Sequence, residues 1–261
     1  KVSTASNGGI TAFSSATDTV NVTVTAVNDA STIASLSGDS RAYSEGAGAV
    51  VIESGNAVVA DVDSTNFDTG TLTVSIPAGG DSAEDVLSIR NQGTGAGQIG
   101  VSGSTVTYQG VTIGTFTGGS SGSNLVITLN SSATPTAVTA LVRNITYQNT
   151  DTNAPTTGAR TVRYVLTDGD GGTSANYDTT VTVSSANDAP TITNDGAGVT
   201  ASISIAENTT AVTTVTATDV DAGQTLTYSI VGGADAAKFT IDSSTGQLSF
   251  LSAPNYESAT D

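Results

Sequence analysis

Residues 19–24 read TVNVTV, with an apolar side chain at every second position and a polar one between. Successive side chains of a β-strand point to opposite faces, so this spacing predicts a half-buried strand. Thr, Val, Ser and Gly recur along the whole chain, whereas helix formers are scarce. We therefore expect an all-β protein, with a short helix at residues 136–144, where apolar side chains share one face.

The composition argues against several kinds of chemistry. The 261 residues include no cysteine, histidine, methionine or tryptophan, so disulfides, thiol chemistry and imidazole chemistry are excluded. Acidic residues outnumber basic ones by 24 to 7, and the formal charge of −17 opposes binding to nucleic acid or to anionic lipid. No apolar run approaches the roughly 20 residues that span a bilayer, so we expect no membrane insertion of this segment. The chain is expected not to be an enzyme.

A strand-like run that ends in Asn-Asp occurs twice. Residues 23–30 read TVTAVNDA, and residues 182–189 read TVSSANDA and are followed by Pro190. Repeats of this kind mark units of the same architecture. The proline after the second copy predicts a boundary between two domains.

An Asp-Val-Asp motif also occurs twice, at residues 61–63 and 219–221. A strand-like run follows each copy, TLTVSI at 71–76 and TLTYSI at 225–230. About 33 residues separate Asn-Asp from the next Asp-Val-Asp in both copies, so the two motifs belong to one repeating unit.

The repeats predict three domains. Residues 1–30 are expected to form the C-terminal hairpin of a preceding β-sandwich repeat, and residues 31–190 a complete β-sandwich. Residues 191–261 are expected to form the N-terminal part of a further repeat. The middle domain is long for a sandwich, and its extra residues lie in glycine-rich hairpins at 93–103 and 118–122.

These motifs resemble those of the cadherin-like tandem repeats in large bacterial surface adhesins, including the extender regions of RTX-type adhesins. The resemblance covers nearly the whole chain, and the middle domain is also similar to proteoglycan-type repeats. It rests on Ala206-Glu207-Asn208, Asp219-Val220-Asp221, Tyr256-Glu257 and the linker Asn187-Asp188-Ala189-Pro190. It implies tandem Greek-key β-sandwich domains, of the cadherin or immunoglobulin type, in an elongated array.

In that family Ca²⁺ lies between successive domains, and the carboxylate and amide oxygens present here are the ligands that Ca²⁺ prefers. The resemblance implies three sites along this chain. The first would use Asn28, Asp29, Asp61 and Asp63; the second Glu45, Asn187, Asp188, Asp219 and Asp221; and the third Glu207, Glu257 and Asp261.

The chain departs from the family pattern at several positions. The family usually carries an aspartate two residues before the linker asparagine, where this chain has Ala26 and Ser185. Ser31 stands where the linker proline is expected, and Tyr147-Gln148 is the expected counterpart of Tyr256-Glu257 in the middle domain. These differences predict fewer ions, or weaker binding, at the affected sites.

Other interpretations compete with calcium at single motifs. Asp and Asn also stabilise turns without a metal, and residues 168–172, DGDGG, are better explained as a tight hairpin turn than as a calcium loop. Residues 95–100 match the dinucleotide fingerprint by letter, but a strand-like run follows where a helix is required. That segment is therefore expected to be a hairpin.

The features together predict a secreted or cell-surface protein that extends an adhesin and stiffens it with calcium. Its expected partners are Ca²⁺, neighbouring repeats of the same chain and a cell-surface ligand. A self-assembling extracellular filament or surface layer is an alternative, in which residues 1–30 supply closing strands to residues 191–261 of a like subunit. A carbohydrate-binding module is a third, although a chain without tryptophan offers few aromatic platforms.

Overall fold

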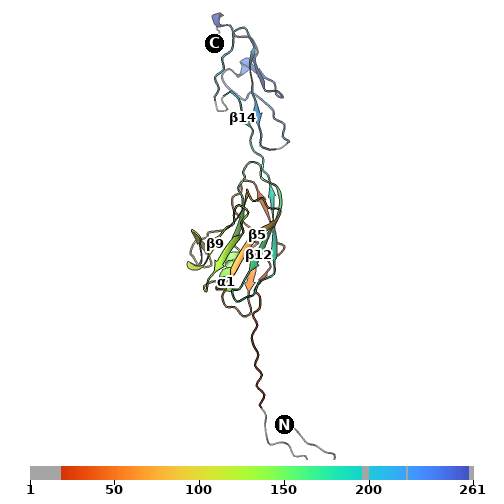
Figure 1. The fold of residues 1–261 in the computed structure, drawn as a ribbon. Coiled ribbons are helices and arrows are strands. Elements are labelled where there is room, and N and C mark those ends of the chain that lie inside the picture. Colours follow the sequence, from red (N-terminus) through yellow and green to blue (C-terminus); the bar gives the residue numbers. More distant parts are fainter. Residues whose placement is uncertain (1–18, 196–199, 222, 259–261) are drawn as a thin grey trace, which may run out of the picture.

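The computed structural model describes residues 19–195, 200–221 and 223–258. It is elongated, with a large middle unit, a smaller C-terminal unit and an extended segment before the middle unit (Figure 1). Strands dominate the described residues, which confirms the predicted all-β fold. The helices there are α1 (Pro135–Val142) and the 3-10 turns η1 (Ala236–Lys238) and η2 (Tyr256–Ser258).

The middle unit is built on an eight-stranded sheet of order β2-β13-β12-β5-β10-β9-β8-β7. Its strands are β2 (Ser40–Ser44), β5 (Thr71–Ala78), β7 (Ile99–Ser102), β8 (Thr105–Tyr108), β9 (Val111–Thr117), β10 (Leu125–Leu129), β12 (Gly158–Leu166) and β13 (Tyr177–Ser184). All neighbours pair antiparallel except β2 and β13, which are parallel. The run at 71–76 is therefore a strand, as predicted, and the run after the fingerprint-like segment is β8.

A smaller sheet of order β3-β11-β6 forms the second layer of this unit. Its strands are β3 (Val50–Val51), β6 (Asp85–Ile89) and β11 (Ile145–Asn149), and a separate pair joins β1 (Thr32–Ala34) to β4 (Val58–Ala60). The ring of Tyr43 on β2 meets the ring of Tyr147 on β11 edge to face, with centroids 5.2 Å apart. The two sheets therefore pack face to face.

The predicted helix is confirmed, one residue earlier at its start and two at its end. Thr134 caps α1 by accepting a hydrogen bond from the backbone amide of Ala137, and Pro135 occupies the first turn, where a missing amide proton costs least. Ile145, the residue after the expected helix, begins β11.

The core follows the alternation of the strands. On β12 the inward positions Val162, Tyr164 and Leu166 are fully buried, and on β13 so are Val181 and Val183. All buried apolar side chains of the described residues lie between Ile33 and Val183.

The C-terminal unit is built from two small sheets, β14-β16 and β15-β18-β17. Their strands are β14 (Thr191–Ile192), β15 (Ala211–Thr214), β16 (Ala217–Thr218), β17 (Phe239–Ile241) and β18 (Gln247–Phe250). Among its described residues no apolar side chain is buried. The strand expected at 225–230 is not formed, because no other strand lies hydrogen-bonded beside this segment.

The segment before the middle unit also differs from expectation. Residues 19–31 form no strand, and Val20, Val22 and Val24 are 79%, 82% and 88% exposed. The alternation that predicted a half-buried strand is present, but the described chain places no neighbouring strand or core beside it. Residues 1–18, the remainder of the expected hairpin, lie outside the described residues.

Candidate metal centres at the two junctions

The second junction joins β13 to β14 through residues 185–190. The backbone amide of Asp188 donates to Oδ2 of Asp221 at 2.6 Å, and the amide of Asp221 donates to Oδ1 of Asp219 at 2.8 Å. From the other side, Glu45 accepts a hydrogen bond from the amide of Ala186 at 2.8 Å. Residues predicted as one ligand set thus meet at one linker.

Two carboxylate oxygens at this junction are buried without a hydrogen-bond partner. They are Oε1 of Glu45 and Oδ2 of Asp188. Glu45 is only 9% exposed, so its charge has lost most of its water. A buried carboxylate oxygen without a partner is costly, and a cation would compensate it.

The fifth residue of the set, Asn187, lies beside Gln224. The side-chain amide of Gln224 donates to Oδ1 of Asn187 at 2.6 Å, and Nδ2 of Asn187 donates to the carbonyl of Asp188. The amide oxygen of Asn187 is therefore already engaged by a residue that the sequence did not single out.

The first junction repeats the same contact. The backbone amide of Asp29 donates to Oδ2 of Asp63 at 3.0 Å, as Asp188 does to Asp221. Oδ1 of Asp61 accepts from the amides of Asp63 and Ser64, while its Oδ2 is buried without a partner. The internal repeat is thus matched by a repeated geometry.

Asp168 joins the first junction, although we predicted a turn there. The turn prediction is correct, since residues 168–172 connect the antiparallel strands β12 and β13. Asp168 is fully buried, and its Oδ2 accepts from Nδ2 of Asn28 at 2.9 Å. Ser64 also donates to Asp170 at 3.4 Å. The position of Asp168 directly after a buried strand was the available signal for a role at this end of the sandwich.

The pKa of Asp168 lies below its ordinary value. Burial acts to raise this pKa, but the hydrogen bonds from Asn28 and from the backbone amides of Asp170 and Gly172 outweigh it. Asp168 therefore stays ionised and adds a carboxylate to the first junction.

The third expected site is only partly described. Oε2 of Glu207 accepts a hydrogen bond from the backbone amide of Tyr256 at 3.0 Å. Glu207 therefore contacts the residue that directly precedes Glu257 in the sequence. Both carboxylates are exposed. Asp261 lies outside the described residues. The expected counterpart Tyr147 is instead in the core of the middle unit, fully buried.

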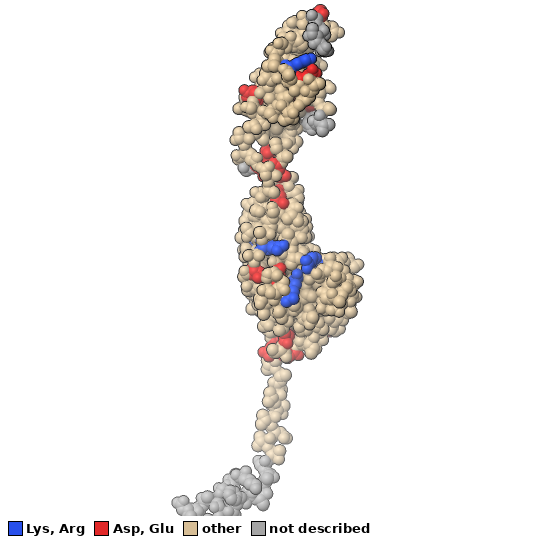
Figure 2. All heavy atoms as spheres, turned by 180° about the vertical axis from the view of Figure 1, so that it is seen from behind, with Lys and Arg blue, Asp and Glu red and all other residues tan. Residues whose placement is uncertain are grey.

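In the part of the chain that the structure describes, no ion pair involves a junction acid. Within residues 19–195, 200–221 and 223–258, the ion pairs found join Arg160 to Asp85, Arg163 to Asp178 and Lys238 to Asp235. Figure 2 shows acidic side chains gathered at both ends of the middle unit and basic ones on its body. In the same described ranges no three acidic side chains converge closely enough to form a complete metal cage. The junctions thus hold partial ligand sets.

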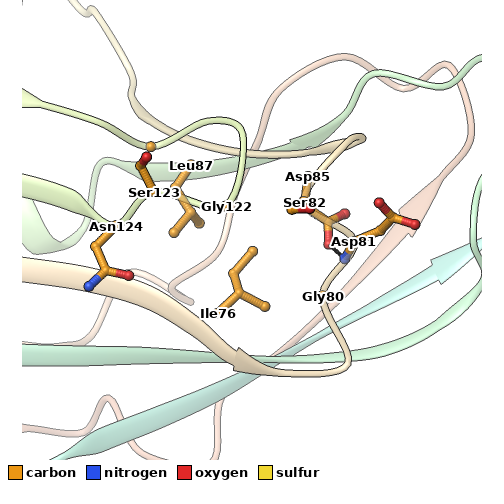
Figure 3. Close-up of a pocket in the computed structure, with 10 residues that line it drawn as sticks. Ile76, Gly80, Asp81, Ser82, Asp85, Leu87, Gly122, Ser123 and Asn124 are labelled. Carbon is orange, nitrogen blue, oxygen red and sulfur yellow. Dashed lines mark hydrogen bonds between the residues drawn. The ribbon is translucent and has the colours of Figure 1, made fainter.

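A separate acidic group, around Asp85, is structural. Asp85 on β6 accepts from Nε of Arg160 at 3.3 Å and from the hydroxyl of Tyr147, and its Oδ2 accepts from the amide of Asp81. Burial, followed by the hydrogen bond and charge of Asp85, raises the pKa of Tyr147 far above its ordinary value. Asp85 also lines a cavity of about 240 Å³ (Figure 3). Its charge is matched by Arg160, so it is not free to bind a metal.

Residues 201–260 match the family model described as "Cadherin domain". No curated protein matches the chain. Similar solved structures include protocadherin gamma B7 extracellular cadherin domains 1–4, at 16% identity and a TM-score of 0.36, covering 87% of this chain and 44% of that one. Mouse cadherin-23 EC22–24 is 19% identical with a TM-score of 0.33, covering 88% and 56%. The chain spans less than two thirds of each, and at these scores the likeness does not extend to function. No helix of the described residues is long and apolar enough to cross a membrane.

Proposed function

We propose that this chain is an extender segment of a secreted or surface-attached adhesin, in which Ca²⁺ at the junctions holds successive β-sandwich units in line. The observation that carries this proposal is the contact between the linker and the following Asp-x-Asp motif, made by the same atoms of Asp29 with Asp63 and of Asp188 with Asp221. One arrangement occurring twice in a chain indicates a device for joining units rather than a local turn.

The residues fit the chemistry of calcium. Ca²⁺ takes about 6–8 oxygen ligands, supplied by carboxylates, amide carbonyls, backbone carbonyls and water. The second site would use Glu45, Asn187, Asp188, Asp219 and Asp221, and the first Asn28, Asp29, Asp61, Asp63 and Asp168. The buried unpartnered oxygens of Glu45, Asp188 and Asp61 support this assignment, since each needs a positive partner.

Electrostatics explains how the ion would act on shape. Without a cation, the acids on the two sides of a linker repel one another, and the linker is free to bend. A bound Ca²⁺ supplies charge that draws Glu45 of one unit and Asp219 and Asp221 of the next toward one position. Because the ion binds the ordered junction, it also stabilises that order by mass action.

The place of action follows from the same chemistry. Calcium modules outside cells work with dissociation constants of about 10⁻⁴–10⁻³ M, so partial ligand sets such as these suit an extracellular protein. The match of residues 201–260 to the cadherin domain supports an extracellular adhesive role and neighbouring repeats as partners.

Small-angle X-ray scattering of the chain with Ca²⁺, and then with excess chelator, tests the proposal. We expect a longer maximum dimension and a narrower spread of shapes with Ca²⁺. Mg²⁺ at equal ionic strength controls for screening, because it demands a tighter octahedral site. An identical scattering profile in Ca²⁺ and in chelator would show that Ca²⁺ does not stiffen the chain.

A further inference from the structure

Ser31 ends the first linker, and its hydroxyl is buried without a hydrogen-bond partner. The residue is 1% exposed, and among the described residues no group forms a hydrogen bond with its Oγ. A buried hydroxyl without a partner costs free energy, because its bonds to water have been lost and not replaced. In the second copy of the linker the corresponding residue is Pro190, which has no hydroxyl.

The pairing of β1 with β4 places Ser31 and Asp61 on one face. The two strands pair antiparallel, with Ile33 opposite Val59, and both of these side chains are buried in the core. Side chains two residues apart along a strand share a face. Continuing the register outward by two residues therefore brings Ser31 opposite Asp61, at the end of the inward face that is nearest the linker.

Asp61 carries a second buried oxygen without a partner. Its Oδ1 accepts from the amides of Asp63 and Ser64, whereas its Oδ2 has no partner in the described chain. The hydroxyl of Ser31 does not donate to this oxygen. Two facing residues thus each hold a buried oxygen that one bound species could satisfy together.

The hairpin between β12 and β13 packs against the linker just before Ser31. A Cβ atom at Gly172 would lie 2.8 Å from Nδ2 of Asn28 and 3.0 Å from Cα of Ala30, so this close approach requires glycine. The same hairpin carries Asp168, whose fully buried carboxylate accepts from Asn28. Ser31 therefore follows linker residues that are packed against an acidic turn.

The charge of this junction favours a cation over a water molecule as the missing partner. Asp61, Asp63 and Asp168 are carboxylates of the junction, and none of them belongs to an ion pair of the described residues. A buried water could form hydrogen bonds with both oxygens, but it would leave the negative charge uncompensated. Ca²⁺ compensates the charge and binds through oxygen ligands.

The second junction provides an internal comparison. β14 and β16 pair with Thr191 opposite Thr218, so Pro190 faces Asp219 as Ser31 faces Asp61. Pro190 is exposed, and within the described residues Asp219 has no buried oxygen without a partner. The unpartnered oxygen on the first aspartate of the motif therefore occurs where the linker carries serine and not where it carries proline.

We infer that the hydroxyl oxygen of Ser31 is a Ca²⁺ ligand at the first junction, where it binds the ion together with Oδ2 of Asp61. The inference rests on the proposed role of Ca²⁺ and adds a ligand to the same site. Serine in place of the linker proline then strengthens this site, although the departure from the family pattern predicts weaker binding.

Titration with Ca²⁺, followed by nuclear magnetic resonance of the backbone amides, tests the assignment because each junction has its own signals. The amides of Asp29 and Asp63 report on the first junction, and those of Asp188 and Asp221 report on the second. Loss of one neutral contact corresponds to a change of about 2- to 10-fold in a binding constant. We expect Ser31→Ala to weaken Ca²⁺ binding at the first junction by this factor and to leave the second unchanged.

Thr107 provides the matched control. Its Oγ1 is also buried without a partner among the described residues, but it lies on β8, whose neighbours β7 and β9 carry no junction residue. Thr107→Val keeps the shape of the side chain and removes the hydroxyl. In chelator we expect both variants to melt at the temperature of the parent or above it, since each loses an unsatisfied polar group. In Ca²⁺ only Ser31→Ala is expected to lose part of the stabilisation.

The outcomes separate this inference from the proposed function. If the parent binds Ca²⁺ and Ser31→Ala has the same midpoint at Asp29 and Asp63, the inference is overturned while the calcium proposal stands. Equal losses of affinity in Ser31→Ala and Thr107→Val would also overturn it, because the effect would then not depend on the junction. If no junction amide of the parent responds to Ca²⁺, the inference and the proposed function both fail.

Discussion

The backbone amide of Asp188 donates a 2.6 Å hydrogen bond to the carboxylate of Asp221, 33 residues further along the chain. This contact connects the linker that leaves the middle unit to the Asp-x-Asp motif of the C-terminal unit. The amide of Asp29 makes the same contact with Asp63, 34 residues away. Both linkers therefore hold their aspartates against an acidic motif that carries no basic partner among the described residues.

Substitution of Asp221 by Asn tests the second junction. The change keeps an acceptor for the amide of Asp188 but removes a charge that Ca²⁺ requires. Hydrogen bonds and contacts to charged groups contribute about 1.5–3 kcal/mol, so we expect Ca²⁺ affinity at this site to fall about 10- to 100-fold. Isothermal titration calorimetry measures the change. Asp151→Asn, at an acid whose carboxylate accepts from the amides of Asn153 and Ala154 rather than from a linker residue, is the charge-matched control and is expected to bind normally.

Asp168 predicts an effect at acid pH. Its pKa is lowered in the folded protein, so its ionised form contributes stability above the unfolded value of 3.8, and that contribution is lost as the pH falls through the folded value. We expect Asp168→Asn to be less stable than the parent at pH 7 and the difference to shrink below about pH 4. Urea unfolding at a series of pH values measures this. A difference that is constant with pH would contradict it.

Strands of the middle unit could be predicted from the sequence, because the alternation of apolar and polar side chains is visible within a few consecutive residues. The run at 71–76 became part of β5, and the helix near residue 136 was placed to within two residues. The repeated spacing between Asn-Asp and Asp-x-Asp also pointed to residues that the structure brings into contact, Asp29 with Asp63 and Asp188 with Asp221.

What sequence reasoning missed depends on distant partners. Residues 19–24 and 225–230 alternate as strands do, yet neither forms one, because a strand needs a neighbour that its own sequence does not specify. Asp168 meets Asn28 across 140 residues, and Arg160 meets Asp85 across 75. The fold brings these pairs together, so the sequence around each residue does not show which distant partner it meets.

The buried pair of Arg160 and Asp85 predicts a large loss of stability on substitution. The two side chains are 1% and 3% exposed, and Arg160→Met would leave the carboxylate of Asp85 buried without its cation. Removing one partner of such a pair costs about 3–5 kcal/mol. We expect a loss of this size in urea unfolding, and partial recovery when Asp85→Asn is added.

A half-exposed pair in the same sheet provides the comparison. Arg163 and Asp178 are 34% and 41% exposed, and Arg163→Gln is expected to cost about 0–1 kcal/mol because water screens the pair. Equal costs for Arg160→Met and Arg163→Gln would show that burial does not decide the contribution of an ion pair in this protein.

Substitution of Glu45 tests whether this residue is a calcium ligand or a structural acid, because the two roles predict different changes in melting temperature. Among the described residues its Oε1 is buried without a partner, and its other oxygen accepts from the amide of Ala186. Without Ca²⁺, replacing this charge by Gln removes an uncompensated buried carboxylate, so we expect the melting temperature to stay the same or to rise. With Ca²⁺ the parent gains stability by mass action, about 2.7 kcal/mol at a hundredfold excess over the dissociation constant, and Glu45→Gln loses most of that gain. Thermal melts in chelator and in Ca²⁺ measure both effects. A fall in melting temperature of the same size in both conditions would mean that Glu45 serves only to hold the linker through Ala186.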